Sequence, residues 1–122
     1  MTFNAWQLTG AENMKFNIND IGGNIAKQDD RYIVKDNTSL KNLVVSSTHL
    51  KSRKSTSGHK HEGQEEVYYF VQGTGKMELD NETFKVQQGD VVLIEDGVFH
   101  RVHAGMYEDL YFVCVFDGRR TH

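Results

Sequence analysis

The chain has 122 residues, of which 38% are hydrophobic and 11% aromatic, and its formal net charge is −3. This length allows one domain with one hydrophobic core. Acidic and basic residues are interspersed, so the charge pattern predicts no basic face and nucleic acid is not an expected partner. No apolar run is long enough to span a membrane, and the first residues lack the charged and apolar regions of a signal peptide. We therefore expect a cytoplasmic protein without a membrane partner.

Residues 1–42 carry weak structural signals, because their apolar residues follow no sustained period. We expect an irregular N-terminal arm that packs on the rest of the domain or on a partner subunit. Within it, residues 20–30 are interpreted as loop and residues 31–35 as a short strand. Trp6 and Phe16 are expected to cover an open end of the core or to pack on a partner.

Residues 43–117 predict an all-β core. The expected strands are 43–50, 91–94, 98–103 and 110–116, together with a hairpin that turns at 80–82. Short strands separated by turn signals in this way are typical of a sandwich or barrel. The strand Val91–Ile94 is predicted to be fully buried by its composition, and residues 118–122 are expected to form a tail.

The single cysteine, Cys114, lies in the apolar run at residues 110–116. It cannot form an internal disulfide. We interpret it as a buried, inert thiol, consistent with a reducing compartment.

The stretch from residue 58 to residue 73 carries the main candidates for chemistry. His59 and His61 lie two residues apart, and Glu65 and Glu66 follow shortly after. If this stretch is a strand, its period of two places both histidines on one face. Their imidazoles can then converge with a carboxylate on one metal ion.

The spacing of these residues resembles the first motif of the cupin superfamily, Gly-x5-His-x-His-x3,4-Glu-x6-Gly. His59 and His61 are followed after four residues by Glu66, and after six more by Gly73. This frame selects Glu66 and not Glu65 as the motif glutamate.

A later stretch resembles the second motif of the family, Gly-x5-Pro-x-Gly-x2-His-x3-Asn. Gly89, Gly97 and His100 keep its spacing. Three positions depart from the two motifs: Arg53 replaces the first glycine, Glu95 the proline and Ala104 the asparagine. These are turn or packing positions, so we expect adjusted loops and an intact barrel.

The resemblance implies a cupin double-stranded β-helix, a jelly-roll barrel, over residues 43–117. It also implies a site for one divalent transition metal ion. The positions that the family uses as metal ligands are kept as His59, His61, Glu66 and His100. Iron, manganese, nickel, zinc and copper all stay open as the metal.

Tyr68 and Glu66 are the candidate catalytic residues. At period two Tyr68 shares the face of Glu66, where its phenol can hold a substrate oxygen, transfer a proton or simply line the pocket. Glu65 is a weaker candidate for a general base, because it is expected to point outward.

The other histidines are weaker candidates. His49 has no motif partner, and His122 is a terminal residue. If His100 points inward, period two turns His103 to the opposite face. The cations of residues 51–54 are interpreted as solvated loop charges or as holders of an anion at a barrel mouth.

Fold alone does not decide function, so three hypotheses stay open for the small-molecule substrate and its chemistry. Residues 66–77 resemble a segment of cupin sugar-phosphate isomerases, which implies a metal-dependent isomerase or epimerase acting on a sugar or similar polyhydroxy compound. The alternatives are a non-haem iron dioxygenase and a non-catalytic metal- or ligand-binding module. Exposed strand edges and the aromatic arm also predict a homodimer.

Overall fold

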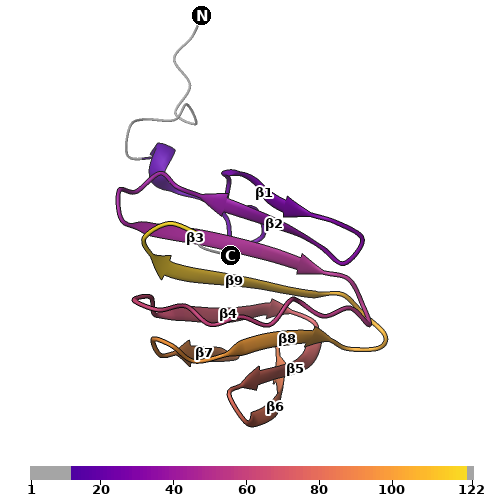
Figure 1. Cartoon of the computed structure of the whole chain (residues 1–122). Helices are drawn as coiled ribbons and strands as arrows, with labels where there is room; N and C mark the ends of the chain where they lie inside the picture. Colours follow the sequence, from indigo (N-terminus) through magenta and orange to yellow (C-terminus); the bar gives the residue numbers. More distant parts are fainter. Residues whose placement is uncertain (1–11, 121–122) are drawn as a thin grey trace, which may run out of the picture.

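The computed structural model describes residues 12–120, and nearly all of its regular structure is β (Figure 1). After a short 3₁₀ helix at Glu12–Met14, the strands are β1 (Asn24–Gln28), β2 (Tyr32–Asn37), β3 (Leu43–Leu50), β4 (Glu66–Gln72), β5 (Thr74–Leu79), β6 (Glu82–Gln87), β7 (Val91–Ile94), β8 (His100–Ala104) and β9 (Leu110–Asp117). Among the described residues no helix has the length and apolar character needed to cross a bilayer.

The strands form two antiparallel sheets. One has six strands in the order β1-β2-β3-β9-β4-β7, and the other has three in the order β6-β5-β8. The loop at residues 54–59 runs beside β8, for example where the N–H of Thr56 donates to the carbonyl of Val102 at 2.9 Å. This arrangement confirms the predicted all-β, double-stranded β-helix.

The interpretation of residues 20–30 as loop within an irregular arm was wrong, because Asn24–Gln28 pair with β2 and form the strand β1. Both strands fall within the expected arm and extend the six-stranded sheet. The strand expected at 31–35 is observed as β2, and its side chains Tyr32 and Val34 belong to the core. Phe16 is 48% exposed, with its ring against Gly22. Trp6 lies outside the described residues.

The prediction that Val91–Ile94 is fully buried was wrong. Val91 is 57% exposed and Leu93 is 69% exposed, whereas Ile94 is buried. The reason is the side of the sheet: Val91 and Leu93 pair with Tyr69 and Val67 of β4, which are also exposed, so the outer face of the six-stranded sheet meets solvent here. One face of β7 therefore meets the core and the other meets solvent.

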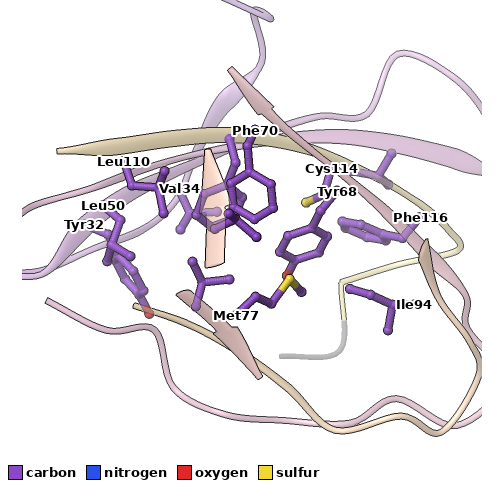
Figure 2. Close-up of a cluster of buried hydrophobic side chains, with 14 residues drawn as sticks. Tyr32, Val34, Leu50, Tyr68, Phe70, Met77, Ile94, Leu110, Cys114 and Phe116 are labelled. Carbon is purple, nitrogen blue, oxygen red and sulfur yellow. The ribbon is translucent and has the colours of Figure 1, made fainter. Parts of the chain in front are cut away.

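The core lies between the two sheets and mixes aliphatic and aromatic side chains (Figure 2). On β9 the buried, inward face consists of Leu110, Phe112, Cys114 and Phe116. Burial raises the pKa of the Cys114 thiol to about 12. The thiol is therefore protonated and unreactive at neutral pH, which confirms the prediction of a buried, inert cysteine.

Candidate metal centre

Four side chains meet at one end of the barrel and could hold a metal ion: His59, His61, Glu66 and His100. Their potential ligand atoms all lie within 4.8 Å of one another. Glu66 Oε1 is 3.1 Å from His61 Nε2 and 3.4 Å from His100 Nε2. Two ligands that are each about 2.1 Å from a shared ion at right angles lie roughly 3 Å apart, so these separations suit a single ion.

The two histidines of the first motif do not lie on a regular strand, which corrects the strand interpretation. They belong to the loop between β3 and β4, and β4 begins only at Glu66. His59 is placed by two reciprocal backbone hydrogen bonds with His100, of 3.2 Å and 2.9 Å. The imidazoles therefore converge because the loop pairs with β8, not because of strand periodicity.

The turn before β8 holds the position of His61. The N–H of Gly97 donates to the carbonyl of His61 at 2.8 Å, and the N–H of Gly63 donates to Asp96 Oδ1 at 2.8 Å. Gly97 adopts a φ of +81°, which glycine reaches without steric cost. The Glu95-Asp96-Gly97 turn thus forms without the proline of the family motif.

Backbone carbonyls fix the orientation of two of the imidazoles. His59 Nδ1 lies 3.0 Å from the carbonyl of Ser57, and His100 Nδ1 lies 3.1 Å from the carbonyl of Val98. A carbonyl accepts a proton from Nδ1, so Nε2 carries the lone pair toward the cluster. Metal-binding histidines in general use their second nitrogen in this way.

The charge state of the cluster also fits a metal cation. Burial, with repulsion from the other histidines, lowers the pKa of His59 from 6.5 to about 3. Burial likewise lowers the pKa of His61, although Glu66 opposes the shift. Neutral imidazoles are the ligand form of histidine.

Buried atoms without protein partners complete the argument for a fit. Both carboxylate oxygens of Glu66 and Nε2 of His100 are buried and lack a hydrogen-bond partner within the described part of the chain. Leaving such groups unsatisfied is costly. A bound divalent cation would satisfy them together, so these residues fit the metal site that the sequence predicts.

Arg53, which replaces the first motif glycine, has a φ of +68°. This left-handed conformation explains why a glycine suits the position. The local turn is kept by backbone hydrogen bonds, including one from the N–H of Arg53 to the carbonyl of Gly105 at 2.9 Å.

The weaker candidates lie apart from the cluster. His49 Nε2 contacts Asp109 at 2.7 Å on the surface. His103 contacts Ser55 and Glu78 and does not belong to the cluster that contains His100. Glu65 is exposed, as expected. His122 lies outside the described residues.

A cavity of about 40 Å³ opens beside the cluster. Its lining includes Lys27, Thr48, Thr56, Ser57, His59, Tyr68 and Arg120. Tyr68 stacks on Phe112 with ring centroids 5.2 Å apart and meets His100 edge-on at 5.7 Å. The candidate catalytic phenol therefore lies beside the candidate metal ligands, as predicted.

The two cations of this cavity were missed by the sequence reasoning. Lys27 lies in the stretch interpreted as loop, and Arg120 lies in the expected tail. The loop cations at residues 51–54 do not line this cavity. Only the pairing register of β1 reveals that Lys27 faces the cavity, and this register is not visible in the sequence. No pattern in the sequence pointed to Arg120.

A double-stranded β-helix with three histidines and one glutamate clustered at one end defines a barrel protein with a site suited to a metal ion. The chain belongs to the cupin family, because the profile described as a cupin domain matches residues 47–116. The match includes all four residues of the cluster.

Three known proteins illustrate the similarity. The uncharacterized protein MJ1618 of Methanocaldococcus jannaschii is 33% identical over 82 residues, which cover 58% of this chain and 66% of that protein. An oxalate-binding protein of Thermotoga maritima is 33% identical over 57 residues, which cover 47% of each chain. The structure of KdgF from a Halomonas species superposes with a TM-score of 0.71 at 21% identity, covering 80% of this chain and 89% of that one.

These similarities support different conclusions. The similarity to the KdgF structure shows a shared fold. The chain spans about two thirds or less of the length of the curated relatives that it matches. The comparisons therefore establish the family and the architecture.

Proposed function

We propose that the protein is a metal-dependent enzyme that acts on a small, oxygen-rich molecule, and that the reaction is an isomerisation or epimerisation of a sugar or similar polyhydroxy compound. The observation that carries the proposal is the position of Tyr68. Its phenol lines the cavity beside the four converging donor groups. A phenol donor and a metal site can together stabilise the negative oxygen that forms when a proton leaves the carbon beside a carbonyl. The carboxylate oxygen of Glu66 that does not bind the ion would accept that proton.

In this proposal the four clustered side chains bind the metal and Tyr68 donates a proton. His59, His61, Glu66 and His100 would hold the ion. A bound divalent metal would polarise a carbonyl or hydroxyl oxygen of the substrate. Burial raises the pKa of Tyr68 well above its usual value. The phenol therefore keeps its proton at neutral pH and acts as a donor to a substrate oxygen.

Exchange of substrate hydrogen with solvent tests the proposal. The metal-loaded protein is incubated in D₂O with a panel of aldoses, ketoses and hydroxy acids, and deuterium incorporation at carbon is followed by NMR. We expect metal-dependent exchange with at least one compound, reduced about 100-fold or more in Tyr68→Phe, because general acid catalysis contributes roughly that factor. Tyr107→Phe is the control, since Tyr107 is exposed and does not line the cavity.

The same panel separates the alternatives. Oxygen uptake by the iron-loaded protein without exchange would replace the isomerase with a dioxygenase. Binding without exchange or oxygen uptake would replace it with a non-catalytic module.

We also propose that the chain forms a homodimer through the outer face of β4 and β7. Val67 lies opposite Leu93, and Tyr69 lies opposite Val91, and all four side chains are exposed. This β4–β7 strip carries no charge, so a second copy of the same strip is complementary to it. Packing two such strips face to face would remove apolar surface from water.

Light scattering after size exclusion tests the dimer. We expect twice the chain mass for the wild type and a shift toward monomer for Leu93→Asp. Leu40→Asp is the control, because Leu40 is also exposed but lies outside the strip. A monomeric wild type at micromolar concentration would contradict the proposal.

A further inference from the structure

The cavity beside the metal cluster contains a cation whose role the proposed chemistry does not explain. Lys27 and Arg120 both line it. Within residues 12–120, the protein already neutralises the charge of Arg120 but not the charge of Lys27. Lys27 is therefore the cation that is available to a ligand.

Arg120 is neutralised within the chain. Its Nε and Nη2 donate to the carboxylate of Asp36 at 2.6 Å and 2.7 Å, and Nη2 also donates to Ser46 Oγ at 2.8 Å. Its guanidinium lies over the ring of Phe116, 5.2 Å from the centroid. Arg120 therefore lines the cavity as a side chain held in place by a bidentate ion pair with a carboxylate.

Lys27 forms no ion pair with any residue between 12 and 120. Burial lowers the pKa of Lys27, and so does repulsion from Arg120 and Arg31. Asp36 and Asp29 oppose this shift, but these two carboxylates are already paired with Arg120 and Arg31, respectively. The cavity thus holds a positive charge that the described chain does not balance. An incoming anion would balance it.

The backbone of β1 directs Lys27 into this cavity. Ile25 pairs with Lys35 and is 57% exposed on the outer face, whereas Lys27 pairs with Val34, a core residue. In a regular strand Ile25 and Lys27 would share one face. The register shifts at Ala26, as in a β-bulge, and this shift turns Lys27 to the inner face.

The row of side chains that contains Lys27 leads across the sheet toward the cluster. Val34 pairs with Thr48, and Thr48 pairs with Phe112, which stacks on Tyr68. Lys27, Thr48 and Tyr68 all line the cavity. The cavity therefore brings Lys27 together with Tyr68 and with His59, one of the four candidate metal ligands.

We propose that Lys27 is a specificity-determining residue that binds a carboxylate of the substrate, while another oxygen of the same molecule faces the His/Glu cluster. The inference rests on the proposed function, whose substrate class it narrows to small organic acids, including sugar acids. A cavity of about 40 Å³ admits only one compact end of such a molecule.

Equilibrium binding tests the proposal without relying on turnover. Calorimetric titrations of glycolate, glycolamide and inorganic phosphate are made on the full chain loaded with zinc, and the metal content of every variant is measured. Glycolate and glycolamide have similar size and differ in charge. The variants are Lys27→Met, Lys27→Gln and Lys27→Arg, with Lys41→Met as the control, because Lys41 is an exposed loop residue.

We expect Lys27→Met and Lys27→Gln to weaken glycolate binding about tenfold to a hundredfold, the range of a charged hydrogen bond. Glycolamide binding and zinc content should not change, and Lys27→Arg should keep most of the affinity. The proposal is overturned if glycolate does not bind the zinc-loaded wild type, if glycolamide is weakened equally, if Lys41→Met has the same effect, or if phosphate binds in place of glycolate. Failure of the wild type to bind zinc would instead contradict the metal centre, and the measurement of metal content detects that failure separately.

Discussion

Two regions of the protein place histidine beside carboxylate, and they differ in how the groups are satisfied. On the surface, His49 contacts Asp109 at 2.7 Å and His103 contacts Glu78 at 2.5 Å. At the end of the barrel, His61 and His100 flank Glu66 at 3.1 Å and 3.4 Å. Short distance alone therefore does not distinguish a metal site from a surface pair.

Burial and convergence make the distinction. The side chains of the surface pairs are about 30 to 53% exposed, so water and the partner together satisfy them. The side chains of Glu66 and His100 are 1% exposed, and several donor atoms point to one place. A bound cation would satisfy a buried cluster of this kind, whereas a surface pair needs nothing further.

The largest contrast is expected in metal content. We predict about one transition metal ion per chain in the wild type and a near-complete loss in His61→Ala, because one of four converging ligands is removed. His49→Ala is the matched surface control and should keep the metal. Elemental analysis of protein purified without chelator measures both. Equal content in His61→Ala and the wild type would show that the cluster is not the metal site.

Removal of the metal should lower thermal stability. His100 lies on β8 in the three-stranded sheet and Glu66 lies on β4 in the six-stranded sheet, so a shared ion would link the two sheets. At 100 times the dissociation constant, ligation contributes about 2.7 kcal/mol, equivalent to roughly 10 °C in Tm for a domain of this size. Calorimetry with and without chelator measures the difference, and His61→Ala should show none.

The metal-free protein should lose stability in acid through the buried histidines. The pKa of His59 is about 3 in the folded chain, against an ordinary value of 6.5. Between these values the unfolded chain binds a proton that the folded chain does not. The free energy of unfolding therefore falls as the pH drops below 6.5. Denaturant melts at pH 7.5 and pH 5 should show this fall, and it should be smaller in His59→Gln.

The smallest effect is expected at the surface. We predict that His103→Gln changes the free energy of unfolding by about 1 kcal/mol or less, because an ion pair that keeps roughly a third of its surface in contact with water contributes little. Its metal content should equal that of the wild type. A loss of metal in this variant would break the distinction between the two regions.

Sequence reasoning predicted which four side chains converge, because the two family motifs are defined by residue type and spacing. His59, His61, Glu66 and His100 stand in two motif frames, and the fold brings them together. The reason for their convergence differs from the one expected, since His59 is placed by pairing with β8 and not by strand alternation. Spacing alone cannot reveal which backbone segment holds a loop.

The remaining errors come from tertiary position. Composition marks Val91–Ile94 as a buried strand, yet Val91 and Leu93 lie on the outer face of the six-stranded sheet and are exposed. Whether another layer covers a face of a sheet depends on tertiary packing, which local pattern does not contain. Arg120 was missed for the same reason, because its partner Asp36 lies 84 positions away along the chain.

The register shift in β1 has a consequence for how this chain is aligned with its relatives. The position equivalent to Lys27 is defined by its pairing with Val34 and not by its distance from Ile25. A relative that lacks the extra residue at Ala26 would present its equivalent of Lys27 on the same inner face, one place earlier in its own numbering. An alignment of β1 without a gap would then compare a cavity residue with a solvent-facing one, and the organic-acid site would be overlooked.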